Sequence, residues 1–510
     1  MGRSFKTRAT RKLINPASEE KEVNVSSLSR LEERVTFIRN GLYLSDDLSI
    51  RDLIFNDSRV KLIFIDTIVD VNSIQMNVIK PMQETPFGNL SHIVNGATII
   101  ETVDLQNALD ALVDGSCLLI QENEECMLLI PTPKDQSAHR IEPINEKVVR
   151  GSHQGFSENV SENVQFIRER ITNRNVTVKY SHVGETTKTK YALVSISTLT
   201  NPDLVKTIES RIAAIASDSI QSPGYFEEFL EDNSFSPFPQ FLNTERPDRV
   251  EANLMEGRMV LLMEGSPTAL IFPVSFFSFF QTAEDYNSRP FISSFLRLIR
   301  LLSFITTLCL PAFYIAVISY NYEVIPVEIV FSIKSSLEYL PFPPLIEAAI
   351  MQFTLELLRE AAIRLPNPVA QTIGVVGGLV IGTAVVEANF VSNTMVIVVA
   401  ITAISSFVIP SNELSTSVRI LGFPLMILAS LFGFFGIVIG AMFILIHLAK
   451  LKSLGHYYLY PLVPLDLKAW KDTFIRVPIW LMKERPKDLR ALYKWKTTDP
   501  RRWKKNEQSD

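Results

Sequence analysis

The chain has 510 residues, of which 47% are hydrophobic, and its 50 Lys and Arg against 55 Asp and Glu give a net charge of −5. This mildly acidic balance offers no reason to expect a nucleic-acid partner. The composition is uneven, because residues 1–290 carry 29 basic and 40 acidic side chains, whereas the rest contains long apolar stretches. The sequence therefore predicts a large soluble part followed by a membrane part.

Motifs of catalysis or metal binding do not stand out anywhere in the sequence. There is no phosphate-binding glycine loop, no paired-cysteine metal spacing, and the six histidines are scattered. The three cysteines suggest no disulfide framework, and Cys117 and Cys126 are expected to be buried free thiols. We therefore expect neither an enzyme nor a cofactor. The first 30 residues lack the apolar core of a secretory signal, so the first apolar stretch is expected to direct membrane insertion.

The soluble part divides into an arm and two mixed α/β subdomains, which together form an α+β region. Residues 1–29 are predicted to be a flexible polar arm, residues 30–145 the first subdomain, and residues 146–290 the second. In the first, periodicity predicts a buried strand at Val60–Ile65, helices at Val71–Ile79 and Leu105–Val113, and a hairpin of Cys117–Gln121 with Cys126–Ile130.

The second subdomain shows a similar mixture of signals. Its predicted elements are a helix at Val160–Ile171, strands at Val176–Tyr180 and Tyr191–Ser197, a helix capped by Asn201 with Pro202 in its first turn, and a hairpin of Met259–Met263 with Ala269–Val274. The Pro- and aromatic-rich stretch Phe235–Asp248 is either a rigid surface loop or a docking segment for a neighbouring subunit. The apolar run Phe276–Phe280 either lies at the membrane surface or fills the domain core.

Four apolar stretches in residues 291–450 predict an all-α transmembrane domain, because about 20 apolar residues cross a hydrocarbon core of about 30 Å. They are Leu301–Tyr320, Val369–Val386, Val391–Pro410 and Ile420–Ala449. The last, as a single helix, would be about 45 Å long, so it must tilt, kink at Pro424 or extend beyond the membrane. Arg297 and Arg300 before the first stretch, and a basic tail in residues 451–510, predict that both termini face the cytoplasm.

Between the first two stretches, prolines delimit an amphipathic helix at Pro341–Pro366. Its apolar stripe consists of Ile346, Ile350, Phe353 and Leu357, and its polar stripe consists of Gln352, Glu356, Arg359 and Glu360. Arg359 is spaced to pair with Glu356, and Arg364 with Glu360. Two interpretations remain open: the helix lies flat on the outer membrane surface, or it is re-entrant and its polar stripe lines a pore or its mouth, where carboxylates would select cations.

The second stretch carries glycines on one helix face, a pattern that favours tight helix packing. They are Gly374, Gly377, Gly378 and Gly382. The spacing does not say whether the partner helix belongs to the same chain. Glu387 ends this stretch, and it either marks the cytoplasmic helix end or has a pore or gating role. Glu413 and Arg419 are expected at the outer turn before the last stretch, and His447 at the inner interface.

Five segments resemble the A-subunit family of bacterial spore germination receptors. They are EKVVRG (Glu146–Gly151), ENVQFIRERI (Glu162–Ile171), DNSFSPFPQFLNTERPDRV (Asp232–Val250), PFPPLIEAAIMQFTLELLREAAIRLPNP (Pro341–Pro368) and QTIGVVGGLVIGTAVVEA (Gln371–Ala388). The segments before residue 140 and after residue 450 match less distinctly.

The resemblance implies a multi-pass protein of the spore inner membrane that acts with a transporter-like B subunit and a lipoprotein C subunit. It implies a ring-shaped homo-oligomer in the lipid that conducts monovalent cations once a nutrient germinant has bound. On the proline-bounded helix it points to Glu347, Glu356, Arg359, Glu360 and Arg364, and it makes the glycines candidates for packing between subunits. A related accessory protein of the spore dipicolinate-release system shares these motifs and is the alternative.

Overall fold

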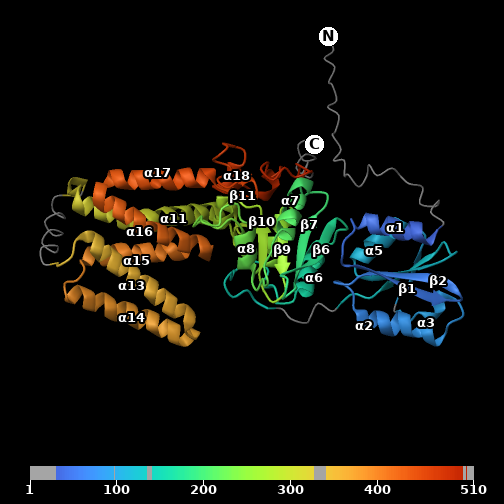
Figure 1. The fold of residues 1–510 in the computed structure, drawn as a ribbon. Coiled ribbons are helices and arrows are strands. Elements are labelled where there is room, and N and C mark those ends of the chain that lie inside the picture. The colour runs from blue at the N-terminus through green and yellow to red at the C-terminus, as the bar shows by residue number, and fades with distance from the viewer. Residues whose placement is uncertain are drawn as a thin grey trace, which may run out of the picture. The chain divides into compact units, whose positions relative to one another are not determined.

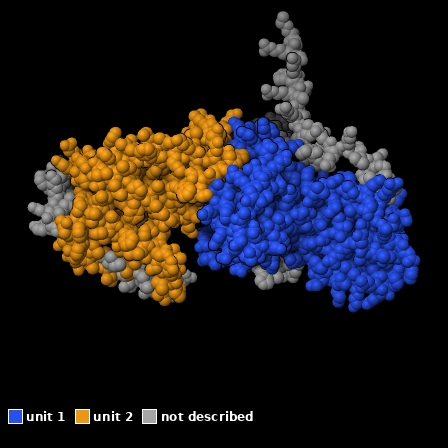
Figure 2. All heavy atoms as spheres, in the orientation of Figure 1, with its two compact units in different colours: residues 1–231, 241–273, 479–510 blue, residues 232–240, 274–478 orange. Residues whose placement is uncertain are grey.

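The computed structural model describes residues 30–134 except 97, 141–324, 326, 340–497 and 501. The chain forms two compact units that are interleaved in sequence, and Figure 2 colours them separately. Unit 1 comprises residues 1–231, 241–273 and 479–510, and unit 2 comprises residues 232–240 and 274–478. The division differs from the linear order expected from the sequence. Residues 232–240 and 274–290 of the expected soluble part belong to unit 2, and the expected tail is divided, with residues 451–478 in unit 2 and residues 479–510 in unit 1. The predicted arm at residues 1–29 lies outside the described residues.

The first subdomain of unit 1 is a five-stranded antiparallel sheet with helices on both faces (Figure 1). The strands are β1 (Leu48–Phe55), β2 (Ser58–Ile65), β3 (Ile100–Thr102), β4 (Ser116–Gln121) and β5 (Met127–Pro131). Helices α1 (Leu31–Gly41) and α5 (Leu105–Val113) cover one face, and α2 (Val71–Ile74), with the helical turns that follow it up to α3 (Lys80–Glu84), covers the other. Because both faces are covered, β4 is buried at every position.

The second subdomain repeats this topology. Its strands are β6 (Val176–Val183), β7 (Thr189–Ile196), β8 (Leu242–Thr244), β9 (Met259–Met263) and β10 (Ala269–Phe272), and its helices are α6 (Val160–Arg170), α7 (Pro202–Ala213), α8 (Pro223–Leu230) and α9 (Pro247–Leu254). The order β6-β7-β9-β10-β8 matches β1-β2-β4-β5-β3 strand for strand. Unit 1 therefore contains the same sheet twice, a relation that the sequence did not reveal.

Most of the predicted soluble elements are confirmed. The strand at β2, helix α5, both hairpins, and the Asn201 cap, whose side chain accepts a hydrogen bond from the Asp203 amide at 3.0 Å, are all present. One expectation about the cysteines is wrong: Cys117 is buried, but Cys126 lies in the turn between β4 and β5 and is exposed. Burial raises the pKa of the Cys117 thiol to about 11, so this thiol is chemically quiet at neutral pH.

A buried ion pair joins the two subdomains. The Arg168 guanidinium on α6 donates to both carboxylate oxygens of Asp47, at 2.9 and 2.8 Å, and to the Ser45 hydroxyl at 3.0 Å. Both charged side chains are at most 1% exposed. Next to them, the Asp46 amide donates to the Val178 carbonyl at 2.9 Å. The loop before β1 thus covers part of the otherwise free edge of β6, which blunts an unpaired strand edge.

Unit 2 is mainly helical. Its long elements are α11 (Pro290–Ser319), α13 (Pro344–Arg364), α14 (Asn367–Glu387), α15 (Asn393–Val408), α16 (Asn412–Phe432) and α17 (Phe434–Lys450). Two of them, α11 and α16, are long and apolar enough to cross a membrane, whereas α15 and α17 are apolar but shorter. The described residues therefore confirm a helical region with two candidate spans, and the number four stays a prediction.

The last apolar stretch is not a single helix, contrary to expectation. Pro424 lies inside α16, and the chain reverses at Gly433, whose φ of 61° and ψ of −139° suit glycine alone. Helices α16 and α17 then pack as a hairpin. A Cβ added at Gly436 would lie 2.0 Å from the Leu428 carbonyl oxygen, so only glycine permits this approach. The sequence could not distinguish a long tilted helix from a hairpin, because both are apolar throughout.

The hairpin changes which turns share an end of the bundle. Tyr320, at the end of α11, donates to the Ser430 carbonyl at 2.8 Å, so α11 and α16 run parallel. Tyr314 contacts Ser392 at 2.9 Å, which places the start of α15 near the end of α11. The turn that carries Glu413 therefore lies at the end where α11 begins, and Glu387 lies at the opposite end. This is the reverse of the sequence-based expectation, which places Glu387 at the cytoplasmic end and Glu413 at the outer turn.

We predict that Asp47→Ala lowers the stability of the junction between the subdomains by about 3–5 kcal/mol, because it leaves the Arg168 charge buried without its partner. Amide hydrogen exchange of residues 45–48 and 176–180 in the purified full-length protein measures this. Glu209→Ala is the matched control. It removes the half-exposed pair with Lys179 and should cost at most about 1 kcal/mol. Equal effects of both substitutions would contradict the assigned role.

Candidate functional site

The charged residues of α13 pair mainly with helices of the same chain. The Glu356 carboxylate accepts from Arg419 on α16 at 2.7 Å, and Arg359 lies 3.6 Å from the same carboxylate. Arg359 also donates to the Ser406 hydroxyl on α15 at 2.8 Å. The predicted pair of Arg359 with Glu356 is confirmed, and so is the pair of Arg364 with Glu360, at 2.6 Å. The partner Arg419 was instead expected at a separate, interfacial place.

The two stripes of α13 face in different directions. The apolar stripe faces outward, with Phe353 and Leu357 more than half exposed. Glu347 and Gln352 are buried on the inner side, where the Ser392 amide donates to one Glu347 oxygen at 3.1 Å. The second Glu347 oxygen and the Gln352 side-chain oxygen have no hydrogen-bond partner among the described residues. Leaving buried oxygens unpaired costs free energy, so the buried surface formed by Glu347 and Gln352 is a candidate functional site. We call it the polar seam of α13.

The glycine face of α14 is open in the single chain. Nothing described lies within 4 Å of a Cβ added at Gly378 or Gly382, and Gly377 is half-buried. Gly374 lies in the helix, but its surroundings are outside the described residues. Glu387, the last residue of α14, is exposed. Of the expected pore or gating candidates, Glu360 and Glu387 are therefore exposed, whereas Gln352, Glu356 and Arg359 turn toward the chain's own helices.

The Pro-rich loop binds its own chain, which differs from both interpretations of the sequence. Residues 232–240 pack on helical unit 2, while the remainder of the stretch forms β8 and the start of α9 in unit 1. The Ser236 hydroxyl contacts Nε2 of His447 at 2.8 Å, Ser417 donates to the Pro237 carbonyl, and Tyr458 donates to the Pro239 carbonyl at 2.6 Å. Phe238 packs between the rings of Phe276 and His447. The loop thus anchors the ends of α16 and α17.

The run Phe276–Phe280 fills the core of unit 2. All five side chains are buried, and Phe276 makes edge contacts with Phe280 and Phe304. The run is therefore buried in a core, but this is the core of the helical unit and not that of the second soluble subdomain to which the sequence assigned it.

An arginine cluster holds the beginning of α11. Asp285 in α10 (Ala283–Asn287) accepts from Arg297 at 3.1 Å and from Arg300 at 2.8 Å, and Arg297 also pairs with Asp472 of the tail at 3.0 Å. Asp285 and Arg297 are each 1% exposed at the side chain. Arg297 and Arg300, which in the sequence predict the cytoplasmic side of the membrane, therefore also have a structural role, because each is neutralised by a carboxylate.

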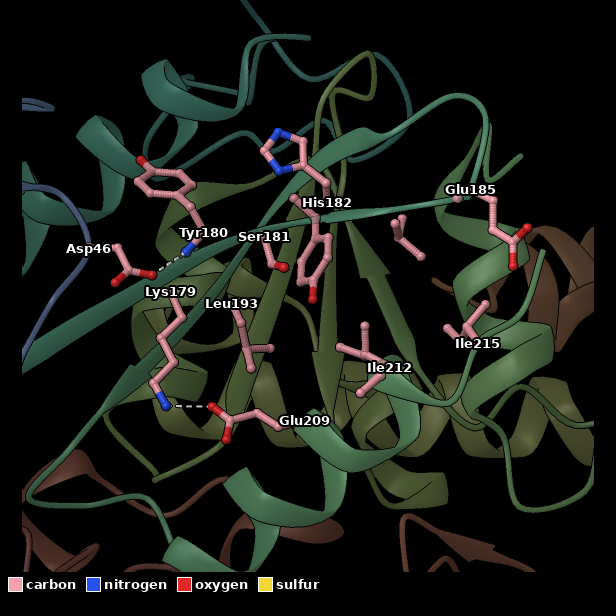
Figure 3. A pocket seen from close by; sticks show the side chains of 14 residues that line it. Asp46, Lys179, Tyr180, Ser181, His182, Glu185, Leu193, Glu209, Ile212 and Ile215 are labelled. Carbon is pink, nitrogen blue, oxygen red and sulfur yellow. Dashed lines mark hydrogen bonds and ion pairs between the residues drawn. The ribbon is translucent and has the colours of Figure 1, made fainter. Parts of the chain in front are cut away.

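Unit 1 contains an open pocket of about 490 Å³ between the free end of β6 and helix α7 (Figure 3). On its walls Lys179 pairs with Glu209 at 2.5 Å, and the Tyr180 amide donates to Asp46 at 2.9 Å. Burial raises the pKa of the Tyr191 phenol beside it. Ser181 and His182 are adjacent on the strand and so point to opposite faces, an arrangement that does not form a nucleophile–base pair. In the described part of the chain, no His, Cys, Asp and Glu group is placed to hold a metal ion.

Comparison with known proteins decides the family. Residues 36–488 match the family model described as Bacillus/Clostridium GerA spore germination protein. The chain belongs to this GerA family. One relative is the "Uncharacterized membrane protein YfkQ" of Bacillus subtilis (strain 168), which is 38% identical over 83% of this chain and 84% of the relative. Another is "Spore germination protein GerLA" of Bacillus cereus, which is 34% identical over 89% of this chain and 94% of the relative. The N-terminal domain of the A subunit of the Bacillus megaterium spore germinant receptor GerK3 covers 49% of this chain, with 27% identity and a TM-score of 0.39.

Two of the quoted GerA-family segments meet in unit 1. Glu146 of EKVVRG pairs with Arg249 of the ERPDRV segment at 2.5 Å. Arg246, 2% exposed, is held by Asp248 at 2.6 Å and by the carbonyl oxygens of Glu146 and Ser152. These residues therefore support packing. The roles of Arg419, Asp285 and Asp472 as charge partners were not predicted, because each pairs with a residue far away in the sequence or on another helix.

We predict that Arg419→Ala destabilises the helical unit of this GerA-family protein by about 1–3 kcal/mol, because Glu356 loses its nearest cation. The melting temperature of the detergent-solubilised protein reports this, and a double-mutant cycle with Glu356→Ala isolates the pairwise energy. The control is Arg364→Ala on α13, the helix that carries Glu356; it removes an exposed pair and should cost at most about 1 kcal/mol. Additive effects of the Arg419 and Glu356 changes would show that the pair does not couple the helices.

Proposed function

We propose that this protein is the A subunit of a nutrient-germinant receptor of the spore inner membrane. In this proposal it acts with a transporter-like B subunit and a lipoprotein C subunit, and its homo-oligomer conducts monovalent cations when a germinant binds. The observation that carries the proposal is the family match over residues 36–488, together with relatives named as spore germination proteins. The helical unit, with two candidate spans, supplies the membrane part.

The open face of α14 supports an oligomer. A glycine face allows close approach of another helix backbone, and the described helices leave Gly378 and Gly382 without such a neighbour. A second copy of the chain is the simplest partner for a self-complementary membrane helix. In this arrangement, the exposed Glu360 and Glu387 carboxylates are available to face a shared conduit, while Glu356 is occupied by Arg419.

A non-conducting accessory role in dipicolinate release is the alternative, and the shared motifs support it equally. The same open glycine face would then pack against a different membrane protein, and the buried polar seam of α13 would have a structural role. The two proposals differ in whether germinant binding opens a path for cations.

We predict that the chain, reconstituted in vesicles with its B and C subunits, releases potassium when germinant is added. Glu360→Ala and Glu387→Ala should each change the selectivity between potassium and chloride, because exposed carboxylates attract cations. Glu101→Ala, which removes an exposed carboxylate of β3 in unit 1, is the matched control and should change nothing. An assembly that binds germinant but shows no flux would contradict the channel and favour the accessory role.

We also predict that Gly382→Leu abolishes the oligomer while leaving the subunit folded, because no described residue lies within 4 Å of a Cβ added there. Gly440→Leu is the contrasting substitution. There a Cβ would lie 2.4 Å from Leu425, so the hairpin of α16 and α17 itself should be destabilised. Mass measurement of the detergent-solubilised particle, with melting curves in parallel, separates the two effects. An unchanged oligomer mass with Gly382→Leu would place the subunit contact elsewhere.

A further inference from the structure

Residues 461–478, between α17 and the tail that rejoins unit 1, expose an unusual number of apolar side chains. Val463, Leu465, Leu467, Trp470 and Ile475 are all exposed, with Leu465 at 66% and Leu467 at 65%. Lys468 and Lys471 lie among them and are also exposed. Exposed apolar side chains gathered in so short a segment indicate a surface that binds something. We call residues 461–478 the collar.

The collar is folded against the body of unit 2. Asp472 pairs with Arg297 at 3.0 Å and accepts from the Tyr286 hydroxyl at 3.0 Å. Phe474 contacts the rings of Phe277 and Trp470, with ring centres 5.0 and 5.2 Å apart. The inward side chains of the collar are therefore satisfied, and the outward apolar side chains are not part of that core.

The position of the collar along α11 suits the polar layer of a bilayer. The Arg476 backbone contacts the Ser294 hydroxyl at 3.1 and 3.2 Å, and Asp472 contacts Arg297. Ser294 and Arg297 precede Leu301, where the uninterrupted apolar stretch begins, by about 10 and 6 Å along the helix. The headgroup layer on each side of the hydrocarbon core is about 5–8 Å thick. If α11 crosses the membrane with Leu301 at the edge of the hydrocarbon core, Asp472 lies at the depth of the lipid headgroups and Arg476 lies just above them.

The chemistry of the collar fits a lipid surface that carries negative charge. Trp and Lys are enriched where a protein meets the membrane interface, and each Lys near an anionic leaflet strengthens binding. The collar follows α17 after ten further residues, 451–460, and α17 exposes Val438, Met442 and Phe443 along its length. Apolar side chains are therefore exposed on both the helix and the collar, and in the collar lysines lie among them.

We propose that the collar lies on the bilayer surface, with Leu465, Leu467 and Ile475 among the upper acyl chains and with Lys468 and Lys471 against the phosphates of anionic lipids. The inference rests on the membrane placement proposed above for unit 2. Asp472, the carboxylate that neutralises Arg297, belongs to the collar. A collar anchored on the membrane surface would therefore fix the depth at which α11 enters the bilayer.

The test uses the full chain with its three cysteines replaced and one new cysteine carrying a polarity-sensitive fluorophore, in vesicles that contain phosphatidylglycerol. Leu467→Cys reports on the collar, Phe443→Cys on α17, and Ile54→Cys, at a 79% exposed site of β1, on water. Lipids with spin labels near the headgroup or deep in the acyl chain serve as quenchers. We expect shallow quenching at residue 467, deep quenching at residue 443 and none at residue 54.

The other possible outcomes each contradict either the collar proposal or the membrane placement of unit 2. Quenching at residue 443 with none at residue 467 refutes the collar and leaves the membrane placement intact. A blue-shifted but unquenched fluorophore at residue 467 means that protein covers the collar, which also refutes the proposal. Absence of quenching at residue 443 refutes the membrane placement itself.

The lysines are tested separately. The double substitution Lys468→Gln and Lys471→Gln should lower the equilibrium constant for binding of the collar to the vesicle surface about 30-fold when the vesicles contain phosphatidylglycerol. It should therefore reduce shallow quenching at residue 467. Lys494→Gln, an exposed lysine of unit 1, is the matched control and should have no effect. Equal quenching with and without the two collar lysines would refute the role of the anionic lipid.

Discussion

Pairing of charged side chains within the chain is the constraint on which the helical unit depends. Ionisable groups in an apolar helical region are costly unless they meet a partner or water. Glu356 meets Arg419 and Arg359, so Gln352, Glu356 and Arg359 of the polar stripe face the chain's own helices, whereas Glu360 and the apolar stripe stay exposed. At the other cluster, Asp285 and Asp472 neutralise the arginines at the start of α11. These two clusters determine which side of α13 and of α11 is available to lipid or to another subunit.

The interleaving of the two units gives the soluble part several routes to the helices. The chain passes between the units at four points, after residues 231, 240, 273 and 478. One of the connected pieces, residues 232–240, is anchored on the ends of α16 and α17 through Ser417, His447 and Tyr458. Residues 232–240 thus contact the helical unit while the chain on both sides of them belongs to the second soluble subdomain. This arrangement suits a receptor whose soluble part influences a membrane part.

Local signals predicted much of the fold. Alternation and turn residues located β2, α5 and both hairpins, and the prolines at residues 344 and 366 correctly delimited α13, because these features depend on neighbouring residues alone. The duplicated sheet was not predictable, since the two copies share topology without an evident sequence repeat. The reversal at Gly433 was missed because an apolar stretch looks the same as one helix or as two. The partners Arg419 and Asp472 were missed because long-range pairing leaves no local pattern, and for the same reason the sequence could not show which stripe of α13 faces inward.

Cysteine cross-linking across α13 and α16 tests the inward orientation of Glu356 most directly. Because Glu356 and Arg419 meet through the tips of long side chains, a direct disulfide between cysteines at these positions would be too short. In a cysteine-free chain held in native-like vesicles, Glu356→Cys combined with Arg419→Cys should instead be joined within one polypeptide by a short bis-maleimide. Phe353→Cys combined with Arg419→Cys, which uses the outward stripe, should not. The account is contradicted if the Phe353 combination reacts and the Glu356 combination does not, because α13 would then face the opposite way and its charges would point out of the subunit.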